Sequence, residues 1–151
     1  NEEIVKVESS YSRLKTQYAV IFFDIDHFKK VNDTYGHECG DVILSTFGKI
    51  LEKSIRDIDL VARYGGEEFI AIIHFNLDRE LLMLLKRIKS IVTENSFIYQ
   101  DKKLKITFSA GVTIRNKYPT YDIALQKADS LLYKAKDSGR NKILLDNGIE
   151  I

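Results

Sequence analysis

The sequence contains one cysteine, one proline and no tryptophan in 151 residues. The single cysteine, Cys39, cannot form an internal disulfide, which excludes a disulfide-stabilised scaffold and is typical of a reducing compartment. No apolar run approaches the ~18 residues of a membrane-spanning helix, because the longest runs, 18–23 and 69–73, have the length of strands. The opening segment, residues 1–8, is polar and acidic, unlike a signal peptide. We therefore expect a cytoplasmic location and no membrane contact by this segment.

An excess of charge of either sign is also absent. Lys and Arg number 23, Asp and Glu number 22, and the formal net charge is +1. This balance argues against a general nucleic-acid binder, so any bound anion must be held by local groups. The length fits one domain, which at this size buries about 68–70% of its unfolded surface. Because the chain does not begin with Met, we expect residues 1–151 to be a single domain of a longer protein.

The spacing of apolar residues predicts an α/β fold. A Gly65-Gly66 loop between two strands predicts a β-hairpin, which makes the central sheet mixed, and Ala110-Gly111 indicates a bulge in a later strand. The expected architecture is a mixed central sheet with flanking helices, of the split-βαβ type. The predicted helices are 1–15, 28–35, 40–53, 77–95 and 120–136, and the predicted strands are 18–25, 60–64, 67–75, 104–115 and 142–145.

Two aspartates lie where the first predicted strand ends. Asp24 and Asp26 offer two carboxylates for a hard divalent cation, and Mg²⁺ typically takes one or two carboxylates together with substrate phosphates. Asp is also favoured at the start of a helix. Capping of the next helix is therefore an alternative that the two aspartates alone leave open.

The predicted hairpin carries the sequence RYGGEEF, residues 63–69. Its glycines allow phosphates to approach the backbone of a tight turn. The two acids that follow, Glu67 and Glu68, are adjacent in a strand, so their side chains point to opposite faces. Only one of them can share a site with Asp24. A hairpin tip with solvated charges is the alternative, although the rest of the strand is apolar.

Cations and polar side chains that can read a purine complete the candidate set. Lys136 and Arg140 lie four residues apart at the end of the last helix and can hold a polyphosphate, although cations also favour helix C-termini. Lys29, Asn32 and Asp41 surround the second helix, and an amide and a carboxylate can read a purine edge. Asn32 equally suits a turn or a cap. Together with the acids and the glycine turn, these residues indicate a metal-assisted nucleotidyl site.

Five blocks of sequence together resemble one family. In order they are FDIDHFKKVNDTYGH (23–37), GD (40–41), RYGGEEF (63–69), SAGV (109–112), and AD with YKAKDSGRN (128–129 and 133–141). These blocks are similar to those of the GGDEF-domain diguanylate cyclases, with GGEEF as the form of the signature here. The resemblance implies the palm-like, ferredoxin-related fold of the nucleotide cyclases. It also implies an N-terminal sensory or receiver domain in the parent protein.

The resemblance further implies an activity, which is the condensation of two GTP molecules into cyclic di-GMP and two pyrophosphates. It implies two Mg²⁺ ions (or Mn²⁺) for each GTP. Because each chain would offer one GTP, the working site would form between two copies in a transient two-fold homodimer. A non-catalytic module that binds cyclic di-GMP or GTP is the alternative from another functional class.

The matching positions carry the roles that the family implies. The implied metal ligands are Asp24, Glu67 and the Ile25 carbonyl. The implied substrate contacts are Phe28, through its backbone, with Lys29, Asn32, Asp41, Gly65, Gly66, Lys136 and Arg140. Glu67 and Glu68 are the implied catalytic residues, and Glu68 would either join the metal shell or assist deprotonation of the attacking hydroxyl.

The tetrapeptide Arg56-Asp57-Ile58-Asp59 lies shortly before the signature. An Arg-x-x-Asp sequence arises often by chance, but its position is in register with the inhibitory RxxD site of the family. Arg56 can fork onto guanine or phosphate, and Asp59 can accept hydrogen bonds from guanine. The resemblance therefore implies feedback inhibition by cyclic di-GMP at this site.

Overall fold

The computed structural model describes residues 4–8, 17–95 and 97–151. At its centre is a five-stranded sheet with the order β2-β3-β1-β6-β7. β1 pairs antiparallel with both β3 and β6, whereas β6 and β7 are parallel, so the sheet is mixed as predicted. The strands are β1 (Tyr18–Ile25), β2 (Leu60–Gly65), β3 (Glu68–His74), β6 (Phe108–Ile114) and β7 (Ile143–Leu145).

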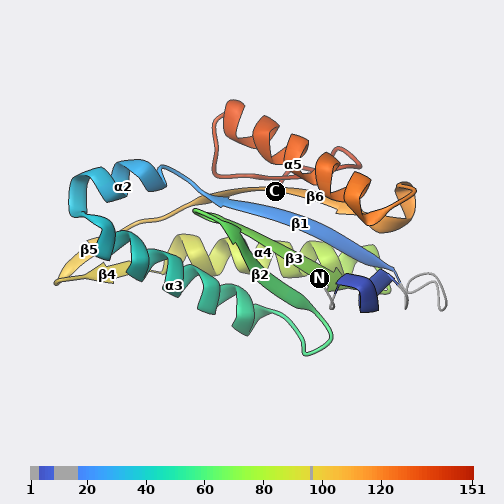
Figure 1. Cartoon of the computed structure of the whole chain (residues 1–151), viewed down its shortest axis with the longest axis horizontal. Helices are drawn as coiled ribbons and strands as arrows, with labels where there is room; N and C mark the ends of the chain where they lie inside the picture. The colour runs from blue at the N-terminus through green and yellow to red at the C-terminus, as the bar shows by residue number, and fades with distance from the viewer. Residues whose placement is uncertain (1–3, 9–16, 96) are drawn as a thin grey trace.

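Helices cover both faces of this sheet. Figure 1 shows α5 lying over one face, with α3 and α4 on the other. β1 is buried along its whole length between these layers, which explains its nearly continuous apolar sequence. The helices are α2 (Phe28–Tyr35), α3 (His37–Ser54), α4 (Asp78–Glu94) and α5 (Tyr121–Asp137), and a 3₁₀ turn spans Arg115–Lys117.

Four phenylalanine rings anchor the sheet to α3. Phe23 of β1 packs edge-on against Phe47 of α3 and against Phe108 of β6, with ring centroids 6.1 and 5.5 Å apart. Phe47 also contacts Phe69 of β3 at 5.2 Å. Phe23 is adjacent in sequence to Asp24, and Phe69 to Glu68. The aromatic core therefore fixes the strand ends from which the candidate acidic residues project.

Three predictions about local structure are corrected. The expected bulge at Ala110-Gly111 is absent, since β1 and β6 pair without a shift of register from Ala19–Ile114 to Ile25–Phe108. Gly111 serves close packing instead, because a Cβ there would lie 2.0 Å from the carbonyl oxygen of Ala128 on α5. The helix predicted over 40–53 begins at His37, directly after Gly36. The strand predicted over 104–115 is interrupted, with β6 beginning only at Phe108.

A small second hairpin was not predicted from the sequence. It consists of β4 (Phe97–Tyr99) and β5 (Lys102–Leu104). Its turn residues, Gln100 and Asp101, both have positive φ, at 48° and 65°. The usual sequence signal of such a turn is Asn-Gly or Asp-Gly, and this turn has no glycine.

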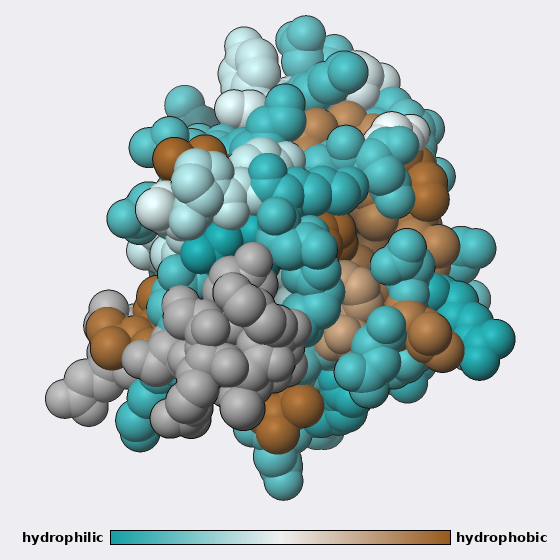
Figure 2. All heavy atoms as spheres, turned by 90° about the vertical axis from the view of Figure 1, so that its right-hand side faces the viewer, coloured by the Kyte–Doolittle hydropathy of each residue, from teal (hydrophilic) through white to brown (hydrophobic). Residues whose placement is uncertain are grey.

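Part of the predicted N-terminal helix is outside the described residues. Of the range 1–15, residues 4–8 are helical, and 1–3 and 9–15 are not described. No helix in the described ranges has the length and apolarity that crossing a bilayer requires. The end of the molecule where β1 begins is largely hydrophilic, with a limited band of hydrophobic surface (Figure 2).

Candidate active site

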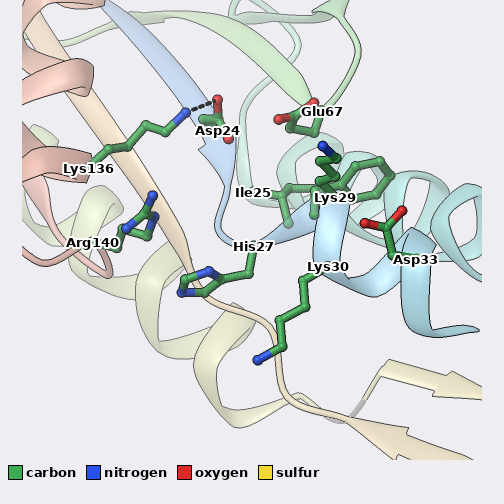
Figure 3. Close-up of a pocket in the computed structure, with 10 residues that line it drawn as sticks. Asp24, Ile25, His27, Lys29, Lys30, Asp33, Glu67, Lys136 and Arg140 are labelled. Atoms are coloured by element: carbon green, nitrogen blue, oxygen red, sulfur yellow. Dashed lines mark hydrogen bonds and ion pairs between the residues drawn. The ribbon is translucent and has the colours of Figure 1, made fainter.

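A cavity of about 490 Å³ opens where β1 ends. Residues from four parts of the chain meet there: the end of β1, the first turns of α2, the β2–β3 turn, and the end of α5 with the turn after it (Figure 3). Its lining residues are Asp24, Ile25, His27, Phe28, Lys29, Lys30, Asp33, Glu67, Lys136 and Arg140. Seven of these ten residues are sequence-predicted site residues, namely all except His27, Lys30 and Asp33.

The end of β1 and the end of α5 meet through an ion pair. Lys136 Nζ donates a hydrogen bond to Asp24 Oδ2 over 2.9 Å. Asp24 is only 4% exposed, and this burial raises the pKa of its carboxyl despite the nearby lysine. The charges of Glu67 and Asp26 raise the pKa of Asp24 further. Burial acts to lower the pKa of Lys136, but its bond to Asp24 and the charges of Glu67 and Glu68 outweigh burial and raise it.

The β2–β3 turn brings a second carboxylate to the cavity. The turn lies at Gly66 and Glu67, one residue later than the Gly65-Gly66 loop predicted from sequence. Gly66 has a φ of 48°, in the left-handed region that glycine adopts readily. The backbone N–H of Ile25 donates to the Glu67 carbonyl over 3.3 Å, which ties the turn to the end of β1. Glu67 therefore faces the same cavity as Asp24.

Glu68 begins β3 and does not line the cavity. It lies opposite Asp24 in the strand register. Burial raises the pKa of its carboxyl, and the charges of Asp24, Asp129 and Glu67 add to this effect, whereas Lys136 opposes it. Glu68 thus lies in a group of carboxylates, of which Asp24 is paired with Lys136.

The start of α2 contributes three residues that sequence reasoning missed. His27 adopts a left-handed backbone conformation, with φ 57° and ψ 29°, directly before the helix. Lys29 and Asp33 both line the cavity, as expected for residues four apart on one helix face. This spacing is a signal that could have identified Asp33, because Lys29 was already a candidate. Nothing comparable in the sequence marks His27 or Lys30.

Asn32 and Asp41 do not line the cavity. The side-chain oxygen of Asn32 is nevertheless buried without a hydrogen-bond partner in the described structure, which is rare for a native polar atom. Asn32 packs against α3, where a Cβ on Gly40 would lie 1.9 Å from that oxygen. Asp41 follows Gly40 on α3 and is exposed.

The glycines of the signature leave open space. An added Cβ at Gly65 or at Gly66 would meet no atom within 4 Å. Neither glycine lines the cavity itself. This open space would let a nucleotide approach the backbone of the two glycines. Their contact with the nucleotide stays a prediction.

The donor set fits a magnesium ion that is shared with a substrate. Three carboxylates line the cavity, of which Asp24 and Glu67 are the predicted metal ligands and Asp33 is the third, and the described residues contain no cluster of three or more His, Cys, Asp or Glu side chains arranged to hold a metal alone. Mg²⁺ usually keeps several waters and binds through one or two carboxylates plus phosphates. Two carboxylates beside Lys29, Lys136 and Arg140 suit that mode better than a self-sufficient protein cage.

Comparison with known proteins agrees with this geometry. Residues 2–142 match the model of the family described as "Diguanylate cyclase, GGDEF domain". The chain belongs to the GGDEF diguanylate cyclase family. It is 37% identical over 145 residues to diguanylate cyclase A of Treponema denticola, an alignment that covers 95% of this chain and 39% of that protein. The chain spans less than half of the length of the curated relatives it matches.

Solved structures of GGDEF domains share the fold. The GGDEF domain of DgcB from Caulobacter crescentus, in complex with c-di-GMP, matches with a TM-score of 0.90 at 27% identity, over 97% of this chain and 88% of that one. The active GGEEF domain of a diguanylate cyclase from Vibrio cholerae matches with a TM-score of 0.80 at 32% identity, over 95% and 91%. The predicted cyclase fold is therefore confirmed.

The RxxD residues of this GGDEF domain lie at a second cavity of about 250 Å³. It is at the other end of the sheet, because Asp59 accepts a hydrogen bond from the backbone of His74, which pairs with the first residue of β1. Asp59 also accepts from the backbone N–H of Arg56 over 3.0 Å, and their side chains are 3.4 Å apart. Arg87 of α4 lines the same cavity and was missed from sequence.

Proposed function

We propose that this GGDEF domain is the catalytic half-site of a diguanylate cyclase, which condenses two GTP molecules into cyclic di-GMP and releases two pyrophosphates. The observation that carries the proposal is the composition of the 490 Å³ cavity. Asp24 and Glu67 face it together with Lys29, Lys136 and Arg140. Paired carboxylates next to a group of cations suit a metal-bound triphosphate, in which metal and phosphate satisfy opposite charges.

Different residues of the cavity would bind the phosphates and the metal of GTP. Lys136, Arg140 and Lys29 orient the terminal phosphates, together with the backbone at Phe28. Asp24, Glu67 and the Ile25 carbonyl would hold Mg²⁺ (or Mn²⁺), two ions for each GTP. When bound, the metal supplies charge neutralisation on the phosphates and acidifies the attacking hydroxyl. The remaining catalysis is positioning and electrostatics.

Two further residues would select the base. Asn32 offers a buried carbonyl oxygen that has no partner among the described residues. Asp41 follows Gly40 on α3, is exposed, and can accept hydrogen bonds from the amino and imino groups of guanine. Adenine lacks the matching donors, so GTP is the expected substrate and ATP is not.

Each chain offers one such cavity, so the reaction needs two copies. The 3′-hydroxyl oxygen of each GTP attacks the α-phosphorus of the other and forms a P–O bond. Pyrophosphate leaves from each α-phosphorus, and each attacking hydroxyl gives up its proton, in which Glu68 would assist. A two-fold homodimer brings the two reacting groups together, because a closed symmetric contact presents identical half-sites to each other. An upstream sensory or receiver domain would control that encounter.

The second cavity supports product inhibition. Arg56, in the loop after α3, and Arg87, on α4, both line this cavity. A guanidinium group can donate two parallel hydrogen bonds to a phosphate or to guanine. Asp59 accepts two backbone hydrogen bonds and so holds this cavity in shape. Its role as an acceptor for guanine requires that a bound ligand replace one of these bonds. Cyclic di-GMP bound here would slow the enzyme.

The test uses the domain fused to a two-fold coiled coil so that dimers are present. It is incubated with GTP and Mg²⁺, and nucleotides are separated by chromatography. We expect two pyrophosphates for each cyclic di-GMP formed, with Asp24→Asn inactive and ATP unreactive. Absence of product from the forced dimer, with cyclic di-GMP still binding, would favour the alternative of a non-catalytic cyclic di-GMP or GTP module.

A further inference from the structure

Asp26 is a buried carboxylate that the proposed reaction does not use. It is 4% exposed and does not line the 490 Å³ cavity, although Asp24 is only two residues away. Its Oδ2 accepts hydrogen bonds from Thr107 Oγ1 over 2.7 Å and from the backbone N–H of Asn141 over 3.0 Å. Its Oδ1 accepts from Ser109 Oγ over 2.7 Å. A carboxylate with this many donors is satisfied without a metal ion.

The bond from the Asn141 backbone reaches an unusual turn. Gly139, Arg140 and Asn141 follow α5 and all have positive φ, at 120°, 63° and 50°. Residues with a Cβ adopt this left-handed backbone at an energetic cost, and it persists only where the surroundings hold it. Backbone hydrogen bonds from both residues that carry a Cβ hold it here. The N–H of Arg140 donates to the Ala135 carbonyl over 2.9 Å, and the N–H of Asn141 donates to Asp26.

The turn determines where Arg140 points. Arg140 lines the cavity from this segment and not from the regular part of α5 (Figure 3). A relaxed backbone at Arg140 or Asn141 would redirect the guanidinium, because a change from left-handed to right-handed φ rotates everything attached to that residue. The hydrogen bond from Asn141 to Asp26 is therefore in a position to fix the direction of a cation that it does not touch.

We propose that Asp26 is a positioning residue, which holds the 139–141 turn so that Arg140 reaches the terminal phosphates of the nucleotide. This rests on the proposed function for the role of Arg140 itself. The two aspartates at the end of β1 then act on the two cations at the end of α5. Asp24 pairs with Lys136 directly, and Asp26 holds Arg140 through the backbone of the next residue. A single short segment thereby aligns both phosphate-binding cations.

The test compares nucleotides with and without terminal phosphates. Affinities for α,β-methylene-GTP, which cannot release pyrophosphate, and for GMP are measured by calorimetry with Mg²⁺ present. Asp26→Ala is expected to weaken binding of the triphosphate about tenfold and binding of GMP less than twofold. In the Arg140→Ala background the same substitution should add almost nothing, since the residue that Asp26 positions is already gone.

A second readout does not depend on nucleotide. Hydrogen exchange of the Asn141 amide, followed by NMR, should become at least about tenfold faster in Asp26→Ala because its acceptor is lost. Thr113→Val is the matched control. It removes another fully buried hydrogen bond between β6 and α5, from Thr113 Oγ1 to the Ala124 carbonyl, and should lower stability without changing the ratio of triphosphate to GMP affinity.

The outcomes separate this proposal from the function on which it rests. If Arg140→Ala leaves triphosphate binding unchanged, Arg140 does not bind the phosphates, and the proposed role of Asp26 is refuted as well. If Arg140→Ala weakens the triphosphate but Asp26→Ala weakens triphosphate and GMP equally, Asp26 is merely structural. Should Asp26→Ala not fold, Asp26→Asn keeps the shape and one acceptor, and its smaller effect must likewise vanish in the Arg140→Ala background.

Discussion

Lys136 and Asp24 are 112 positions apart in sequence and are joined by a 2.9 Å hydrogen bond between Nζ and Oδ2. The bond connects the last helix to the end of the central strand, at the mouth of the cavity. A bound cation and a triphosphate would each take one member of this pair. The pair therefore keeps a buried carboxylate and a half-buried lysine compatible with the fold until ligands replace them.

Replacing Lys136 with Met should both weaken the fold and reduce affinity for GTP. Asp24 would stay buried without its cation, so we expect the free energy of unfolding to fall by about 1–3 kcal/mol. GTP affinity should fall about tenfold. Urea denaturation and calorimetry measure the two effects. Lys134→Met removes the same charge from an exposed position on α5, and equal effects of the two substitutions would contradict a specific role for Lys136.

Glu67→Gln should abolish turnover without affecting the second cavity. The amide is a poorer metal ligand than the carboxylate, and we expect the rate of cyclic di-GMP formation to fall by at least about 100-fold. Binding of cyclic di-GMP at Arg56 and Arg87 should be unchanged, because that cavity is at the opposite end of the sheet. A Glu67→Gln dimer that still makes product would refute the metal assignment.

Asn32→Ala should separate substrate binding from stability. The Asn32 side-chain oxygen is buried and makes no hydrogen bond in the described structure, so its removal should leave the free energy of unfolding within about 0.5 kcal/mol of wild type, or raise it. Affinity for GTP should nevertheless fall about tenfold or more if this oxygen meets guanine. Thermal unfolding and titration with GTP test the two parts. A large loss of stability with unchanged GTP affinity would assign Asn32 to the fold alone.

Two glycines of α3 should respond oppositely to alanine. A Cβ at Gly40 would lie 1.9 Å from Asn32 Oδ1, whereas a Cβ at Gly48 would meet the Phe69 ring at an ordinary 3.4 Å. Gly40→Ala should therefore cost about 1–3 kcal/mol of stability, because the packed side chains of Asn32 and Phe28 must shift to make room. Gly48→Ala should stabilise the helix by about 0.5–1 kcal/mol. Urea denaturation of both variants checks the sign, and a stabilised Gly40→Ala would contradict the close packing of α2 on α3.

Glu68→Gln should stabilise the domain in a pH-dependent way. The pKa of Glu68 is raised above its ordinary 4.5 by burial and by the charges of Asp24, Asp129 and Glu67. The folded protein therefore holds this proton more tightly than the unfolded chain, and the stability gained is full below pH 4.5 and lost as pH rises through the raised pKa. The glutamine variant should be more stable at pH 7 by on the order of 0.5 kcal/mol.

Below the ordinary pKa of Glu68 both proteins carry a neutral side chain, so the difference between them should disappear. Unfolding curves between pH 4 and pH 8 measure this convergence. A stability difference that is the same at both ends of that range would show that the effect is packing and not charge.

The sequence was sufficient to predict the mixed sheet and most of the cavity. Asp24, Glu67, Lys136 and Arg140 were identified because the family blocks that contain them are unmistakable together, and the structure places all four at one cavity. The partnership between Asp24 and Lys136 was not predictable, since no local pattern links residues on β1 and α5. Only the packing of α5 over the sheet brings them together.

Two errors have a common physical origin. Gly111 suggested a bulge because glycine weakens a strand, but the reason for this glycine is the backbone of α5 pressing on the strand, which is a tertiary contact. The turn at Gln100 and Asp101 was missed because its positive φ values lack the usual glycine. In both cases the neighbouring structure, and not the local residue preference, decides the conformation.

β3 connects the two cavities in a way that limits how they can communicate. It begins beside the Glu67 turn and ends at His74, whose backbone donates to Asp59, and it is hydrogen-bonded on both sides, to β1 and to β2. A slip by one residue would exchange its inward and outward side chains, so sliding is forbidden. A ligand at the Arg56 end therefore cannot act on the signature by shifting the register of β3, and any coupling between the two cavities has to leave the pairing of this strand intact.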